Sequence, residues 1–205
     1  MFSEIFIRKH NHINIMPKYF VDIEHLITKE EAMKMISYAK KLRDKALISI
    51  LYLTGARPGE VLDLTTDDIR VSDRELEIKL TTLKQKEGRF HVKKRTLVFH
   101  RPLPSNAFIE TFIDYFLSLP RGYLFKMSDR NLRYIIERVS RDALGFPLCP
   151  YNFRHSRMTE FASEGRGINE LKYLKGATDI RSIAPYLHAR KVYVNFPEVR
   201  IKEET

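Results

Sequence analysis

Residues 150–188 contain PYNFRHSRMT from 150 to 159, LKGATDIRSI from 174 to 183 and APYLH from 184 to 188. Pro147 and Pro150 bracket a predicted loop, and helices are expected near 152–164, 167–175 and 180–188. The first of these helices carries Arg154 near its start, and the last carries Tyr186. This stretch therefore places an arginine and a tyrosine on two short helices, about thirty residues apart in sequence.

A second arginine lies upstream, at the end of a strongly apolar run. ALISILYL, from 46 to 53, is apolar on almost every side and predicts a buried central helix that ends at Gly55. Pro58 favours the first turn of a short helix. Arg57 therefore occupies a corner between two helices, where Glu60 can hold its guanidinium group. A purely structural ion pair between these two residues is the alternative.

The remaining pattern predicts a mainly helical α+β fold with a small three-stranded antiparallel sheet. A capping box begins a helix at Thr28, and further helices are expected at 106–119 and from Asp129, which is predicted to cap its helix. Strands are predicted at 69–71, 76–80 and 96–99, with a polar hairpin tip at 84–89. We divide the chain into an N-terminal arm (1–27), a domain (28–190) and a C-terminal tail (191–205).

Composition favours a polyanionic partner, because 36 basic residues outnumber 26 acidic ones and give a formal net charge of +10. A merely basic soluble protein is the alternative. The single cysteine, Cys149, excludes an intrachain disulfide. The charged N-terminus does not resemble a signal peptide, and no apolar run has the length of a membrane span. A cytoplasmic protein is therefore expected.

Two arginines and a late tyrosine suggest a phenolate that attacks a phosphodiester held by guanidinium groups. TGARPGEVL, from 54 to 62, resembles the first arginine motif of the tyrosine recombinases, the phage-integrase family. Phe153-Arg154-His155 resembles the start of the second arginine motif, and Tyr186-Leu187-His188 resembles the nucleophile motif. The resemblance covers about residues 28–190, and the three motifs occur in the family's order with a β-hairpin between the first two.

The resemblance implies a role for each matching residue. Arg57 and Arg154 would bind the scissile phosphate, and Tyr186 would form a 3′-phosphotyrosine link without a metal or a cofactor. A hairpin lysine would protonate the leaving 5′-oxygen; Lys84 is the first choice and Lys86 the second. Contacts with double-stranded DNA are expected from Lys86, Arg89, Lys93, Lys94, His155 and Arg181. For Lys93 and Lys94 the alternative is a solvated face without a DNA contact. For His155 the alternative is a structural role, in which it packs beside the site.

Two positions depart from the family pattern. Tyr151 stands where most members have a histidine, and Ala177 stands where most have a histidine or tryptophan. Tyr151 can donate a hydrogen bond to phosphate, whereas the Ala177 side chain can donate nothing. Two tyrosines are rival nucleophiles: Tyr173, which is expected in the core, and Tyr193, which is expected in an extended tail.

The resulting expectation is a site-specific recombinase that integrates or excises a mobile element and assembles as a dimer or tetramer on DNA. Replacement of the usual histidine, here by Tyr151, resembles the pattern of integrases from archaeal viruses and plasmids. A DNA-binding protein of the same fold with impaired catalysis is the first alternative, and a basic helical adaptor is the second. Residues 1–27 are too short for the family's N-terminal domain, so the chain is either a catalytic fragment or a minimal enzyme.

Overall fold

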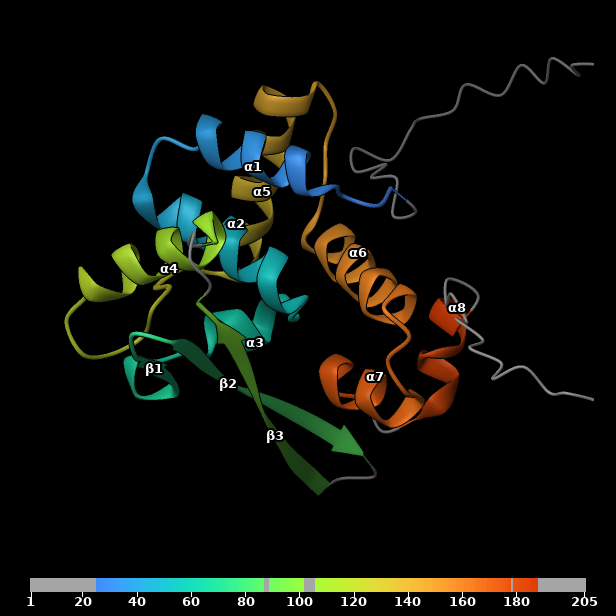
Figure 1. Cartoon of the computed structure of the whole chain (residues 1–205). Helices are drawn as coiled ribbons and strands as arrows, with labels where there is room; N and C mark the ends of the chain where they lie inside the picture. Colours follow the sequence, from blue (N-terminus) through green and yellow to red (C-terminus); the bar gives the residue numbers. More distant parts are fainter. Residues whose placement is uncertain (1–24, 87–88, 102–105, 178, 188–205) are drawn as a thin grey trace, which may run out of the picture.

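The computed structural model describes residues 25–86, 89–101, 106–177 and 179–187 (Figure 1). The predicted C-terminal tail and most of the predicted N-terminal arm lie outside these residues, as do His188 and Tyr193. The expected fold class is confirmed: helices form most of the described structure, beside a three-stranded antiparallel sheet. No helix in the described ranges is long and apolar enough to cross a membrane.

The helical body is built around α2 (Leu42–Thr54), the predicted central helix. It packs against α1 (Lys29–Tyr38), α4 (Ala107–Leu117) and α6 (Pro150–Ser163), while α5 (Asp129–Leu144) packs against α1 (Figure 1). Leu47, Ile50 and Leu51 are completely buried in this core. Each such side chain stabilises the fold by about 1.5–3 kcal/mol relative to an exposed one.

Helix boundaries agree with the sequence where a local signal defines them. The hydroxyl of Thr28 accepts a hydrogen bond from the amide of Glu31, whose carboxylate accepts one from the amide of Thr28, so the predicted capping box is confirmed. Gly55 ends α2 in the left-handed conformation, with φ of 57°.

Two predicted boundaries are wrong. Ser128, and not Asp129, caps α5, because its hydroxyl accepts a hydrogen bond from the amide of Asn131. Helix α6 begins at Pro150 and not near 152. Proline is well tolerated at the first helical position, because the amide hydrogen that it lacks would have no partner within the helix there.

The sheet has the order β1-β2-β3, with β1 at Ile69–Val71, β2 at Glu75–Lys86 and β3 at Arg89–His100. The second and third strands are longer than predicted, and the predicted polar tip at 84–89 is wrong: Lys84 pairs with His91 inside the hairpin. The prediction ended these strands where polar residues begin. Pairing between β2 and β3 nevertheless continues, because each strand satisfies the backbone hydrogen bonds of the other regardless of side-chain polarity.

Three short elements complete the described chain: α7 (Ile168–Lys175), the 3₁₀ turn η2 (Ile180–Ser182) and α8 (Ala184–Leu187). The predicted helix at 180–188 is therefore divided, since Pro185 cannot donate the hydrogen bond that would continue one helix through it. These elements lie near the C-terminal end of α6, with α7 beside the long hairpin (Figure 1). They enclose a second, smaller core made of Met158, Phe161, Ala162, Leu171, Ala177, Ile183 and Tyr186.

The short helix α3 (Pro58–Leu62) follows α2 after a sharp corner, and the 3₁₀ turn η1 (Thr66–Asp68) leads into β1. Helix α3 packs against α5 and β2. The corner between α2 and α3, where Arg57 was expected, therefore lies between the helical body and the sheet.

Candidate active site

Glu60 binds both the backbone and the guanidinium group of Arg57, whose side chain remains partly exposed. The backbone amide of Arg57 donates a hydrogen bond of 2.9 Å to Oε2 of Glu60, and its guanidinium donates one of 3.0 Å to Oε1 of the same carboxylate. The Arg57 side chain is 31% exposed and lines a pocket of about 220 Å³ together with Thr82, Arg133 and Tyr151. The predicted contact between Arg57 and Glu60 is confirmed, and it leaves the arginine facing a solvent-accessible hollow.

Glu60 is in turn anchored to the sheet. Arg95 of β3, whose side chain is completely buried, donates hydrogen bonds of 3.0 and 2.7 Å to the two carboxylate oxygens, and the hydroxyl of Thr82 donates a third. Burial would raise the pKa of Glu60, but these bonds and the charge of Arg95 lower it to about 2. The carboxylate therefore stays ionised and fixes Arg57 relative to β2 and β3.

Arg95 was not predicted from the sequence, although a signal for it existed. Arg95, Leu97 and Phe99 occupy alternate positions of β3, which is the spacing of residues that face the same side of a strand. A charged residue in such an apolar row requires a buried partner. Here the partner is Glu60 of α3, and only the packing of α3 against the sheet shows it.

Arg154 joins the corner of Arg57 to the end of α7. It donates a hydrogen bond of 2.8 Å to the backbone oxygen of Gly55 and another to the backbone oxygen of Lys175. Its side chain is buried, and burial together with the positive charge of Arg57 lowers its pKa to about 10. The two arginines lie about a hundred residues apart in sequence, yet they are close enough in space to repel each other.

Tyr186 lies in the same neighbourhood and is 5% exposed. The centre of its ring is 5.2 Å from the ring of His155 and 4.6 Å from Nζ of Lys175. Burial raises the pKa of its phenol, and the charge of Arg154 opposes this effect. The phenol is therefore protonated at neutral pH and lies next to the cations that would stabilise its ionised form.

Lys175, the last residue of α7, was also not predicted. Its ammonium donates a hydrogen bond to the backbone oxygen of Ser182. Burial and the charges of Arg154 and Arg57 lower its pKa to about 8. A lysine before a C-terminal glycine commonly complements the helix dipole, so this position in the sequence does not by itself indicate a site.

Tyr151 and Ala177, the two departures from the family pattern, occupy different environments. Tyr151 is 41% exposed, lies under the guanidinium group of Arg133 at 5.5 Å and lines the pocket of Arg57. Ala177 is buried in the smaller core, and its amide bonds to the backbone oxygen of Lys172. Of these two residues, Tyr151 is the one that presents a polar side chain to the pocket of Arg57.

The expected DNA contacts are described in part. Lys94 is exposed on β3, and the Arg181 side chain is 89% exposed but forms an ion pair of 2.9 Å with Asp179. The ring of His155 packs against Tyr186, as described above. The side chains of four further candidates on the hairpin lie outside the described part of the chain: Lys84, Lys86, Arg89 and Lys93.

The prediction that Tyr173 lies in the core is wrong. The residue is 43% exposed, and its hydroxyl bonds to both backbone groups of Thr96, accepting from the amide at 2.9 Å and donating to the oxygen at 3.2 Å. The apolar helical pattern around it suggested burial, but the polar end of a tyrosine is better satisfied at a strand edge. Tyr173 therefore ties α7 to β3.

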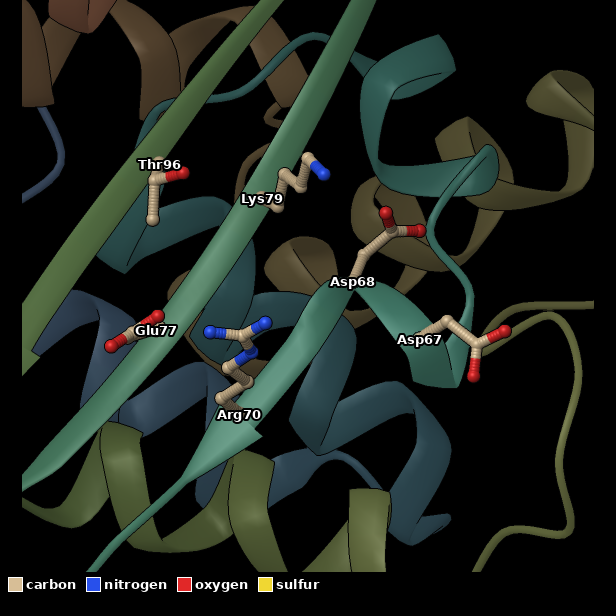
Figure 2. A pocket seen from close by; sticks show the side chains of 6 residues that line it. All are labelled: Asp67, Asp68, Arg70, Glu77, Lys79 and Thr96. Carbon is tan, nitrogen blue, oxygen red and sulfur yellow. The ribbon is translucent and has the colours of Figure 1, made fainter.

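A second hollow, of about 170 Å³, lies on the outer side of the sheet. Figure 2 shows its lining: Asp67, Asp68, Arg70, Glu77, Lys79 and Thr96. Asp67 already forms an ion pair with Arg121, and Asp68 accepts hydrogen bonds from the backbone and side chain of Thr65. This hollow is lined by three carboxylates and two cations, and so is the pocket of Arg57, so the charge count does not distinguish the two. The described residues contain no cluster of His, Cys, Asp and Glu side chains placed to hold a metal ion.

Known proteins resemble this chain in both sequence and structure. A tyrosine recombinase of Thermosipho africanus is 27% identical over 183 residues, which cover 84% of this chain and 60% of that relative. The XerH recombinase, in a post-cleavage complex with its palindromic difH substrate, has a TM-score of 0.63 at 19% identity and covers 82% of this chain and 51% of its own. The catalytic domain of bacteriophage HP1 integrase has a TM-score of 0.53 at 20% identity, and the match covers 82% of this chain and 89% of that domain's chain.

These likenesses differ in what they show. At such identities the solved structures support the fold alone, and this chain spans about 60% of the length of the curated relatives it matches. The sequence pattern of the phage integrase family, in contrast, matches residues 25–192, which is most of the chain. The resemblance inferred from the three motifs is thereby confirmed, and the chain belongs to the phage integrase family.

Proposed function

We propose that this chain carries the catalytic domain of a site-specific tyrosine recombinase, which cleaves and rejoins double-stranded DNA through Tyr186. The observation that carries the proposal is the pair of bonds from Arg154 to the backbone of Gly55 and Lys175, which gathers Arg57, Arg154 and Tyr186 from three separate elements. The relatives named tyrosine recombinase, and the XerH structure described with its substrate, support this assignment.

The proposed reaction exchanges one phosphodiester for another. Arg57 and Arg154 bind the non-bridging oxygens of the scissile phosphate, for which the planar guanidinium group is well suited. The Tyr186 oxygen forms a bond to phosphorus as its proton is lost to solvent, and the bond from phosphorus to the 5′-oxygen breaks. The leaving oxygen takes a proton from Lys84, or from Lys86 if Lys84 is not the acid. The 3′-phosphotyrosine then retains a phosphodiester that a new 5′-hydroxyl can attack.

The other assigned residues have supporting roles in this proposal. Tyr151 donates a hydrogen bond to the phosphate from the rim of the Arg57 pocket. Residues of the hairpin, together with His155 and Arg181, contact the DNA backbone. Residues 28–190 form the catalytic unit, and copies of the protein assemble as a dimer or tetramer on DNA. In the cell the reaction integrates or excises a mobile element.

The burial of Tyr186 favours a second candidate, a DNA-binding protein of the same fold with impaired catalysis. A nucleophile that is 5% exposed must move or be uncovered before it reaches a phosphate. The neighbouring Ala177 supplies no side-chain donor for the transition state, and such a donor is worth about 3 kcal/mol. In this case the arginines would bind DNA without cleavage.

One experiment separates these candidates without a defined target sequence. The protein is incubated with a pool of fluorescent duplexes that have a randomised central segment and a nick, so that a cleaved strand loses its short 5′ product. Covalent complexes are then recovered under denaturing conditions. We expect adducts from the natural chain and none from Tyr186→Phe, with similar DNA binding by both. DNA binding without any adduct from the natural chain would support the impaired protein instead.

A further inference from the structure

Lys175 lies between the proposed nucleophile and the second arginine. Its Nζ is 4.6 Å from the centre of the Tyr186 ring, and its backbone oxygen accepts a hydrogen bond from Arg154. Its ammonium also bonds to the backbone oxygen of Ser182, which immediately precedes the segment that leads to Tyr186. One residue therefore contacts the second arginine through its backbone and the tyrosine through its side chain.

The ammonium group of Lys175 lies in an electrostatically unfavourable position. Burial and the positive charges of Arg154 and Arg57 lower the pKa of Lys175 to about 8. A lysine at the end of a helix can usually extend its flexible stem into water. Glu60, the carboxylate whose negative charge acts on Arg154, already bonds to Arg57 and Arg95. A bound anion would remove this repulsion.

We propose that Lys175 is a third phosphate-binding cation of the strand-cleavage site, acting with Arg57 and Arg154. This inference rests on the proposed function. When DNA binds, the ammonium exchanges the backbone oxygen of Ser182 for a non-bridging oxygen of the scissile phosphate. Its charge then stabilises the additional negative charge of the pentacoordinate transition state. Ala177, two residues further on, offers no side-chain donor, so Lys175 supplies the positive charge on this side of Tyr186.

The test separates the charge of Lys175 from its structural hydrogen bond. Lys175→Gln retains a donor for the Ser182 oxygen but removes the charge, whereas Lys175→Arg retains both. Lys172→Gln is the matched control, since it removes the same charge one turn earlier on α7. Covalent adduct formation is followed in single turnovers on a nicked duplex recovered from the pool. We expect Lys175→Gln to be about 100-fold slower, Lys175→Arg to recover part of the rate, and Lys172→Gln to match the natural chain.

A second substrate tests whether Lys175 acts on the phosphate itself. A methylphosphonate at the scissile position carries no negative charge, so a phosphate-binding cation loses most of its advantage. The defect of Lys175→Gln should therefore be about tenfold smaller on this substrate than on the natural phosphate. Because both rates come from one preparation, any loss of folded protein affects them equally and cancels in their ratio.

The outcomes identify which statement fails. If the natural chain forms adducts and Lys175→Gln forms them equally fast, the role of Lys175 is refuted and the proposed function stands. If Lys175→Gln is equally slow on both substrates, Lys175 does not act on the phosphate charge, and the inference is again refuted. If the natural chain forms no adduct from the pool, the proposed function itself fails, and this inference fails with it.

Discussion

Replacement of Glu60 by glutamine should destabilise the protein by about 3 kcal/mol at pH 7, and two considerations give this value. Removing one partner of a buried ion pair costs about 3–5 kcal/mol, and the Arg95 side chain that would lose its partner is completely buried. Independently, the pKa of Glu60 falls from 4.5 to about 2, which corresponds to roughly 3 kcal/mol in favour of the folded state.

The pH dependence of this effect has a defined sign. Because the folded-state pKa is depressed, the ionised carboxylate contributes its full stability above pH 4.5, and this contribution is lost as the pH falls towards 2. Urea unfolding followed by circular dichroism should therefore show a large difference between the natural chain and Glu60→Gln at pH 7. The difference should become smaller between pH 4.5 and pH 3.

The control for this measurement is Glu160→Gln, which removes a partly exposed partner of Arg157. This substitution should change the free energy of unfolding by less than about 1 kcal/mol. A Glu60→Gln variant that loses no more than this control, or whose loss is the same at pH 7 and pH 3, would refute the reasoning. Glu60 would then not be the anchor that positions Arg57.

Three further substitutions test separate parts of the site. Gly176→Ala would place a Cβ at φ +62° only 2.6 Å from Nη1 of Arg95, so it should cost about 2 kcal/mol and slow adduct formation. Gly59→Ala, with nothing within 4 Å of its Cβ, should leave the free energy of unfolding almost unchanged. Lys84→Ala should cleave normal DNA slowly but should cleave at close to the natural rate a substrate in which sulfur replaces the bridging 5′-oxygen, because the sulfur leaves without protonation. An equal defect on both substrates would transfer the acid role to Lys86. Tyr173→Phe should speed hydrogen exchange of the Thr96 amide and cost about 1 kcal/mol while adducts still form; loss of adducts would instead make Tyr173 the nucleophile.

The sequence predicted those features that local chemistry determines. The capping box at Thr28, the end of α2 at Gly55 and the corner at Arg57 each depend on residues within one helical turn. The contact between Arg57 and Glu60 belongs to the same group, since it spans three residues. Such signals are independent of the tertiary fold.

The features that were missed depend on contacts between distant segments. Arg95 meets Glu60 across 35 residues, and Tyr173 meets Thr96 across 77. Lys175 belongs to the candidate site only because α7 ends beside Arg154 and Tyr186. The hairpin was predicted too short because a paired ribbon satisfies its backbone hydrogen bonds even where its side chains are polar.

The central claim is that Tyr186 becomes covalently attached to DNA within the site formed by Arg57 and Arg154. The most direct test is to digest the covalent complex with nuclease and trypsin and to locate the attached nucleotide by mass spectrometry. We predict a 3′-linked nucleotide on Tyr186, in the tryptic peptide SIAPYLHAR from 182 to 190. Attachment to Tyr173, Tyr193 or any other residue would contradict this claim.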